Sequence, residues 1–161
     1  MTVLVPMRTE VYVPYLKAAI AGYAEDNVAS GRWPRKGAIK RSHADFGKLL
    51  PQGLATPDNY LLEIKATDDG PTVGFIWFAI EERQGVRSAF IYDVAIHAEY
   101  RRQGHATRAF AALEPLVAAV GATSIGLHVF GHNQAAQTLY AKLGYEVTGI
   151  NMGKPLGKRK A

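Results

Sequence analysis

The order of extended and helical segments constrains the fold more than any other feature of this chain. Three strand-like segments follow one another at 60–66 (YLLEIKA), 72–82 (TVGFIWFAIEE) and 88–96 (SAFIYDVAI), joined by the turn sequences DDGP and RQGVR. Connections this short join antiparallel neighbours. Beyond residue 104 helical and extended patterns alternate, as parallel pairing requires, because the chain must cross back over the sheet. The sequence therefore predicts a mixed β-sheet whose first part is an antiparallel meander.

The remaining segments supply the helices that cover such a sheet. Residues 2–7 (TVLVPM) predict a first strand, and apolar residues at helical spacing predict helices at 14–29 and 34–49, each with a proline at its first position. The same criteria then predict a helix ending near 120, a strand at 123–130, a helix at 133–143 and a last strand at 145–152. We expect one α/β domain over residues 1–161, with helices on both faces and a short basic tail from about residue 154.

The lack of cysteine narrows the chemistry. With Cys 0 in the sequence, disulfides, thiolate metal sites and a thiol nucleophile are excluded. The histidines show no metal-ligand spacing, so we expect no metal site. No apolar run reaches the roughly 18 residues that span a bilayer, and the first residues lack a signal-peptide pattern. We therefore expect a cytoplasmic protein without a membrane partner.

The junction RRQGHA at 101–106 lies between the strand that ends at residue 96 and the next helix. The first turn of a helix leaves several N–H groups unpaired, and together with the helix dipole they favour anions. Gly104 and Ala106 let phosphate oxygens approach the backbone, and Arg101 and Arg102 can add charge-assisted contacts. The spacing fits a pyrophosphate cradle, although six residues alone do not decide between a cradle and a solvated turn.

Two segments resemble the motifs of the GNAT N-acetyltransferase superfamily. IHAEYRRQGHATRAF (96–110) resembles its acyl-CoA-binding motif, Arg/Gln-x-x-Gly-x-Gly/Ala, with Ala106 in place of the second glycine. LHVFGHNQAAQTLYAKLGYEVTG (127–149) resembles its second motif, and the first half of the chain looks like one bacterial branch. The resemblance implies a GNAT-like mixed sheet with a splayed parallel centre, and acetyl-CoA as co-substrate.

The resemblance also implies roles for individual residues. Asn133 would bond the pantetheine arm or cap its own helix. Tyr140 would also border the cofactor and act as the general acid that protonates the departing CoA thiolate; the alternative is a packed core tyrosine. The main chain of Val94 and Ile96 would pair with the pantetheine. The pyrophosphate would lie against Arg101 and Arg102 and the backbone N–H groups of Gln103, Gly104, His105, Ala106 and Thr107.

The sequence defines the general base less well. An ammonium nucleophile must lose a proton before it attacks, so a carboxylate, an imidazole or a water relay is needed. Asp93, isolated in an apolar strand, is either this base or a structural carboxylate, and we favour the structural role with deprotonation through water. His128 is a base, a substrate-binding group or a core histidine. Glu63 is expected on the exposed face of its strand.

The sequence is consistent with three classes of function for this chain. The leading one is an N-acetyltransferase in which a small-molecule amine or a peptide N-terminus attacks the thioester directly in a ternary complex. A non-catalytic acyl-CoA-binding module would keep the cradle and lack the base. The net charge of +5 admits a nucleic-acid-binding protein, but the aromatic residues lie on strands expected to be buried, which disfavours it. A homodimer is a further possibility.

Overall fold

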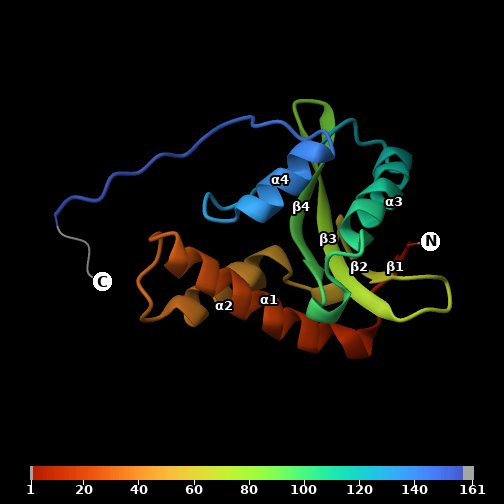
Figure 1. Cartoon of the computed structure of the whole chain (residues 1–161), viewed down its shortest axis with the longest axis horizontal. Helices are drawn as coiled ribbons and strands as arrows, with labels where there is room; N and C mark the ends of the chain where they lie inside the picture. The colour runs from red at the N-terminus through yellow and green to blue at the C-terminus, as the bar shows by residue number, and fades with distance from the viewer. Residues whose placement is uncertain (1, 158–161) are drawn as a thin grey trace.

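The computed structural model describes residues 2–157 and places five strands in one sheet (Figure 1). The strand order is β1-β2-β3-β4-β5; the first three pairings are antiparallel, and β4 and β5 run parallel. The predicted mixed sheet, with a meander followed by a parallel pair, is confirmed. The strands are β1 (Val3–Pro6), β2 (Asn59–Lys65), β3 (Thr72–Arg83), β4 (Val86–Ile96) and β5 (Ile125–Leu127).

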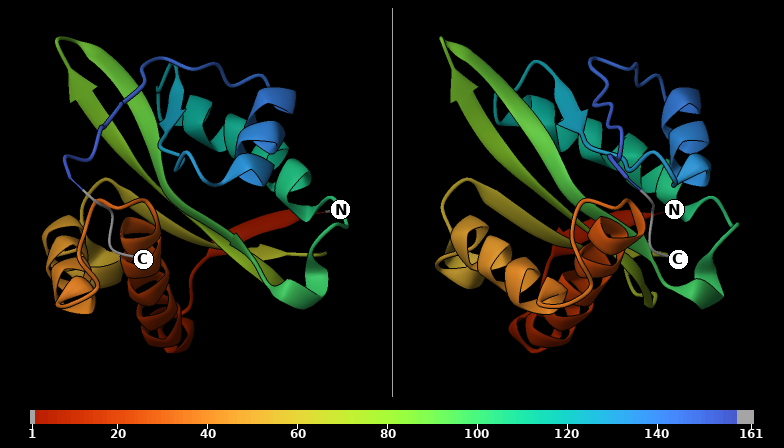
Figure 2. Two further views of the ribbon diagram at one scale, coloured as in Figure 1. Left: turned by 60° about the vertical axis from the view of Figure 1, so that its left-hand side comes forward. Right: turned by 90° about the vertical axis from the view of Figure 1, so that its left-hand side faces the viewer.

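Helices cover both faces of this sheet, as predicted. Figure 2 shows one pair of helices on one side of the strands and a second pair on the other. Short 3-10 turns η1 (Gly53–Ala55) and η2 (Ala98–Tyr100) precede β2 and α3. The helices are α1 (Thr9–Ala29) and α2 (Ala38–Leu49) on the first face, and α3 (His105–Ala119) and α4 (Gln134–Lys142) on the second.

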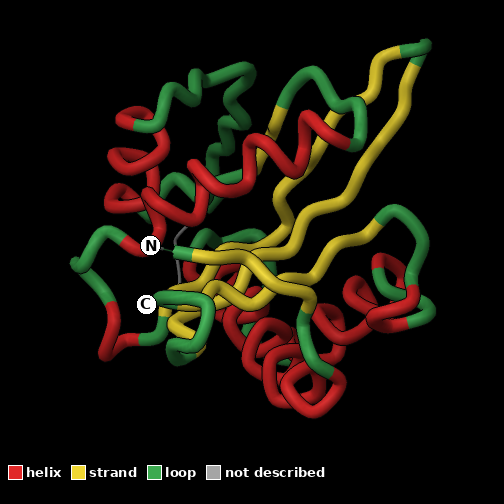
Figure 3. Tube along the Cα trace, turned by 90° about the vertical axis from the view of Figure 1, so that its right-hand side faces the viewer, coloured by secondary structure: helices red, strands yellow, loops and turns green. Residues whose placement is uncertain are grey.

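The alternation of side chains along the strands builds two cores. Leu61 and Trp77 point to the α1–α2 face, where they pack with Tyr15, Ile20 and Phe46. Their strand neighbours point the other way and pack against α3, because successive side chains of a strand face opposite sides. The second core contains Leu62, Ile76, Phe78, Ile91, Phe110 and Leu113. The long β3–β4 hairpin projects past the other strands (Figure 3).

Both proline-based helix starts were wrong. Helix α1 begins at Thr9, because the Arg8 carbonyl accepts from the N–H groups of Val11 and Tyr12 and so starts the helix before Pro14. Helix α2 begins at Ala38, four residues after Pro34. Gly37 precedes it with φ of 78°, a left-handed conformation that cannot continue a helix.

Two strand predictions in the second half differ from the structure. The strand predicted at 123–130 is regular only over Ile125–Leu127. The strand predicted at 145–152 does not form: residues 145–156 have no regular secondary structure, and all of 146–157 are exposed. A strand is stabilised by hydrogen bonds to a neighbouring strand; the Tyr145 N–H donates to the Tyr140 carbonyl of α4, and residues 146–156 make no backbone hydrogen bond within residues 2–157. Residues 158–161 of the predicted basic tail lie outside the described part of the chain.

The aromatic residues of β3 and β4 do not form an exposed stacking surface. Trp77 and Phe78 are buried, and Phe75, Phe90 and Tyr92 are partly buried. The expectation that these aromatic residues lie on covered strands, which argued against nucleic-acid binding, is thus supported. Across residues 2–157, no helix combines the length and apolar character needed to cross a bilayer.

Candidate functional site

The candidate site is an opening in the sheet between β4 and β5. The two strands pair only over residues 89–91 and 125–127, and no ladder joins them beyond that point. A bulge in β4 leaves Tyr92 without a partner on β3. Such a bulge bends a strand and increases its twist. The outer edge of β4 from residue 92 onward therefore faces no strand within residues 2–157.

Main-chain groups of β4 point into this opening. The N–H of His97 donates to the carbonyl of Val73 on β3 at 2.8 Å. Because hydrogen-bonding groups alternate along an antiparallel strand, the main-chain groups of Ile96 and Val94 point to the opposite edge. The Ile96 carbonyl there accepts from Arg101 Nε at 3.0 Å. The two residues predicted to pair with pantetheine thus have main-chain groups at the free edge.

The predicted cradle lies at the N-terminus of α3. Gly104, with φ of 78°, is the residue before the helix, and Arg102 has φ of 60°. No side chain of residues 2–157 caps this end, so the N–H groups of the first turn, His105 to Thr107, keep positions that an anion can occupy. Gln103 Nε2 donates to the Glu99 carbonyl at 3.1 Å and holds the preceding turn closed.

Arg108 contacts the predicted cradle, and the sequence did not identify it. Its guanidinium donates to the Gln103 carbonyl at 2.8 Å and to Thr2 Oγ1 at 3.0 Å, and it contacts His105 Nδ1 at 3.2 Å. A Cβ on Gly104 would lie 2.6 Å from Arg108 Nη1. The signal in the sequence was its position three residues after His105, on the same side of the helix.

His105 is buried at this helix start. Its burial, together with the neighbouring Arg108 charge, lowers the pKa of the imidazole, so the ring is neutral at pH 7. The side chain therefore supports the turn, while its backbone N–H belongs to the predicted cradle.

Asp93 faces the α1 side of the opening. Its Oδ2 accepts a hydrogen bond from Tyr15 Oη at 2.8 Å, and Tyr15 is buried on α1. Burial raises the pKa of the Asp93 carboxyl, although the Tyr15 hydroxyl and the Val94 N–H oppose that effect. Burial and the Asp93 charge likewise hold the pKa of Tyr15 well above its usual range. A carboxylate that resists ionisation in this way is a common feature of functional sites.

Tyr140 borders the same opening from α4. Its ring packs edge-on against Phe110, with the centroids 5.7 Å apart, while its hydroxyl has no hydrogen bond within residues 2–157. Burial raises the pKa of Tyr140, and the charge of Asp93 adds to the effect. The two groups are thus within electrostatic reach, although α1 and α4 cover opposite faces of the sheet.

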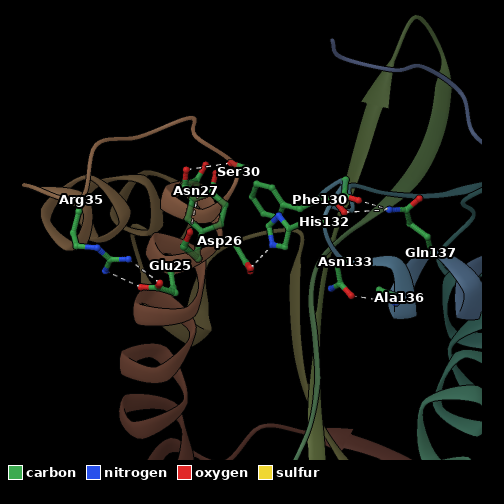
Figure 4. Close-up of polar contacts among 12 residues, drawn as sticks. Glu25, Asp26, Asn27, Ser30, Arg35, Phe130, His132, Asn133, Ala136 and Gln137 are labelled. Carbon is green, nitrogen blue, oxygen red and sulfur yellow. Dashed lines mark hydrogen bonds and ion pairs between the residues drawn. The ribbon is translucent and has the colours of Figure 1, made fainter. Parts of the chain in front are cut away.

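The loop before α4 links the two sides of the molecule (Figure 4). His132 Nε2 lies 3.1 Å from Asp26 Oδ1 on α1. Asn133 Oδ1 accepts from the N–H of Ala136 at 3.2 Å, so Asn133 caps α4, one of its two expected roles. His128 is exposed and lies edge-on to Phe130, so it is not the buried core histidine of the third alternative.

Glu63 is not exposed, contrary to expectation. Its side chain is 1% exposed and accepts from the Arg8 backbone N–H at 3.0 Å, from the Arg8 guanidinium at 3.0 and 3.1 Å, and from Thr72 Oγ1 at 2.7 Å. Burial alone would raise the pKa of Glu63, but these hydrogen bonds lower it to about 2. Glu63, on β2, therefore joins the start of α1 to β3, away from the opening between β4 and β5, and has a structural role.

No group of three or more His, Asp or Glu side chains in residues 2–157 is arranged to hold a metal ion. The titratable groups of the opening are instead one carboxylate and two tyrosines, Asp93, Tyr15 and Tyr140. These three groups can accept and donate protons.

Comparison with known proteins agrees with this geometry. YycN of Bacillus subtilis, described as an uncharacterized N-acetyltransferase, is 38% identical over 153 residues, which cover 95% of this chain and 97% of YycN. YdgE of the same organism, described in the same way, is 31% identical over 150 residues, which cover 93% of this chain and 95% of YdgE. The crystal structure of YycN superposes with a TM-score of 0.93 at 37% identity, covering 98% of this chain and all of that one.

More distant similarity bears on the fold alone. The aminoglycoside 6'-N-acetyltransferase AAC(6')-Ih of Acinetobacter baumannii superposes with a TM-score of 0.55 at 16% identity, over 98% of this chain and 100% of that one.

The family described as Acetyltransferase (GNAT) matches residues 23–145, which include β2 to β5, α3 and α4. The chain therefore belongs to the GNAT acetyltransferase family and is an acyltransferase enzyme.

Proposed function

We propose that this enzyme transfers an acetyl group from acetyl-CoA to a primary amine, either a small molecule or a peptide N-terminus, by direct attack within a ternary complex. One observation carries the proposal. The opening between β4 and β5 has the uncapped N-terminus of α3 at one end and, further along, the titratable side chains of Asp93 and Tyr140, from opposite faces of the sheet. Acetyl-CoA supplies the activated acyl group and a thiolate leaving group.

Binding is assigned to main-chain groups. The first-turn N–H groups of α3 and the α3 dipole would hold the pyrophosphate, with Arg101 and Arg102 beside it. The free edge of β4 at Val94 and Ile96 would pair with the pantetheine amides as an added strand does. An extended ligand held at these two places has its reactive end directed along the opening toward Tyr140 and Asp93. Binding thus fixes the orientation that the reaction needs.

Asp93 is the proposed proton acceptor for the incoming ammonium group. The raised pKa makes its carboxylate a better base than an exposed aspartate. Its negative charge also attracts a cationic amine into a partly buried place. Tyr15 holds Oδ2 in position through a 2.8 Å hydrogen bond. The proton moves to Asp93 either directly or through a water molecule.

Tyr140 is the proposed proton donor for the departing thiolate. Its raised pKa keeps the hydroxyl protonated at neutral pH, the form that a general acid needs. The ring is fixed by Phe110, whereas the hydroxyl has no protein acceptor among residues 2–157 that would compete for the proton. Because the sequence has no cysteine, an acyl-thiol intermediate on the enzyme is excluded, and direct attack is the simplest route.

A CoA-release screen over a library of amines tests this proposal. We expect amine-dependent release of free thiol, with formation of the acetylated amine, and loss of both in Gly104→Asp. A protein that binds acetyl-CoA but releases no CoA with any amine in the library would instead be an acyl-CoA-binding module.

A further inference from the structure

The segment after α4 presents an unusual surface. We define the arm as residues 146–157, all of which are exposed and carry no regular secondary structure. Four large apolar side chains of the arm face solvent, with exposed fractions of 78% for Val147, 76% for Ile150, 92% for Met152 and 93% for Leu156. An exposed apolar segment of this kind marks an interaction surface.

The sequence of the arm is that of a strand. Val147, Thr148 and Ile150 are β-branched residues, which favour extended structure. Gly153 and Pro155 then end the pattern, because proline cannot donate to a strand ladder. The part suited to pairing is therefore 146–152, seven residues that span roughly 23 Å when extended.

A matching edge exists in the sheet. Strand β5 pairs with β4 on one side only, and its other edge has no partner among residues 2–157. Residues 123–130 around it have a strand sequence but are regular over three residues only. An edge with free N–H and C=O groups is a template for another strand. At about 26 Å when extended, this edge matches the arm in length.

The arm does not return along its own β5. Tyr145, just before the arm, contacts both helices of this face: its ring packs against Phe110 of α3, with the centroids 5.8 Å apart, and its N–H donates to the Tyr140 carbonyl of α4. From there the arm runs along the long axis of the molecule and out past the α1–α2 helices (Figures 1 and 2). Among residues 2–157 no backbone hydrogen bond joins it to the rest of the chain.

We propose that the arm pairs with the free edge of β5 in a second copy of this chain, and that the second copy pairs its arm with β5 here. The two exchanges are related by a twofold axis, because each subunit offers the same arm and the same edge. This arrangement covers both open edges and buries the exposed apolar side chains of both arms. It also extends the short β5, because an added partner supplies the ladder that residues 123–130 lack.

The first test measures the oligomeric state of the full chain by light scattering across the micromolar range. We expect a dimer whose dissociation constant rises at least roughly 100-fold in Ile150→Asp, because an unpaired carboxylate would be buried in the exchanged sheet. The control is Ile39→Asp on α2, a residue also exposed, at 58%, but outside the arm, and it should leave the dimer unchanged. A monomeric wild type, or a dimer equally stable in Ile150→Asp, would overturn the proposal.

The second test asks which subunit the arm occupies. Because the chain has no cysteine, Thr148→Cys in the arm and Ser124→Cys beside β5 each introduce a single thiol. The two variants are mixed, allowed to exchange subunits and treated with a short flexible bis-maleimide that tolerates a shift of one or two residues in register. We expect a cross-linked species containing one chain of each variant. A Thr148→Cys/Ser124→Cys double variant that cross-links only within a monomer would place the arm on its own β5 and overturn the proposal.

Discussion

Replacing Asp93 by asparagine separates the catalytic role of this side chain from a structural one. Burial raises the pKa of Asp93 in the folded protein. The native state therefore binds more protons than the unfolded chain at pH values between the unfolded pKa, about 3.9, and the higher folded pKa. The contribution of Asp93 to stability is highest below about pH 3.9 and is lost as the pH rises through the folded pKa, so its charged carboxylate is a net cost at neutral pH.

Two opposite changes set the stability of Asp93→Asn. The substitution removes the cost of the buried charge. It also replaces a charge-assisted bond from Tyr15, of the kind that contributes about 1.5–3 kcal/mol, with a neutral one of about 0.5–1.5 kcal/mol. Because these effects have similar size, we expect the free energy of unfolding at pH 7 to change by no more than about 1 kcal/mol. Urea denaturation of both proteins measures it.

The effect on activity should be much larger. If Asp93 accepts the proton of the amine, kcat/KM should fall by roughly 10²- to 10⁴-fold in Asp93→Asn, and the ascending limb of the pH profile that belongs to the enzyme should disappear. The ionisation of the amine itself contributes a similar limb, so the comparison is between variants assayed with one amine. Asp69→Asn, in the exposed β2–β3 turn, is the matched control and should behave as the wild type.

The opposite pattern would refute this reasoning. A loss of about 3 kcal/mol or more in the free energy of unfolding, with kcat/KM and the pH profile unchanged, would make Asp93 a structural carboxylate. Deprotonation would then depend on water.

Three further substitutions test other parts of the account. Gly104→Asp should abolish the rise in melting temperature that acetyl-CoA causes in the wild type. The control is Gly85→Asp, because Gly85 has the same φ of 78° but lies in an exposed turn, and this variant should keep the rise; a rise that Gly104→Asp also keeps would exclude the cradle. Tyr140→Phe should lower kcat by roughly 10²- to 10⁴-fold with little change in acetyl-CoA affinity, and Tyr145→Phe should not; near-full turnover in Tyr140→Phe would make it a core residue. Glu63→Gln should destabilise the protein by about 2–3 kcal/mol at pH 7, because the folded-state pKa of about 2 lies below the unfolded value near 4.3 and the ionised carboxylate therefore stabilises the fold. This stabilisation is lost as the pH falls from about 4.3 toward 2, so a difference in unfolding free energy between wild type and variant that persists unchanged at low pH would contradict the assignment.

The helix start at the predicted cradle could be predicted from sequence because it is local. Six consecutive residues indicate a helix that begins close to Gly104, and the structure begins α3 at the next residue, His105. The meander was predictable for a similar reason, since short turns leave only antiparallel neighbours.

The contacts that bring distant residues together could not be predicted. Tyr15 and Asp93 lie 78 residues apart, and nothing near either one in the sequence indicates the other. Arg8 and Glu63 are separated by 55 residues, so the strand alternation that predicted an exposed Glu63 could not show that Arg8 covers it. The strand predicted at 145–152 was wrong for the same reason, because it too depends on a distant contact. The composition of this segment favours an extended conformation, but a strand also needs the edge of another strand to pair with.

The most direct test of the proposed acetyl transfer is an initial-rate study in which acetyl-CoA and the best amine from the screen are both varied. Direct attack within a ternary complex predicts lines that intersect in the double-reciprocal plot, with one acetylated amine formed for each CoA released. Parallel lines, together with an acetylated enzyme detected by mass spectrometry in the absence of amine, would contradict direct transfer and would require a nucleophile in this cysteine-free chain.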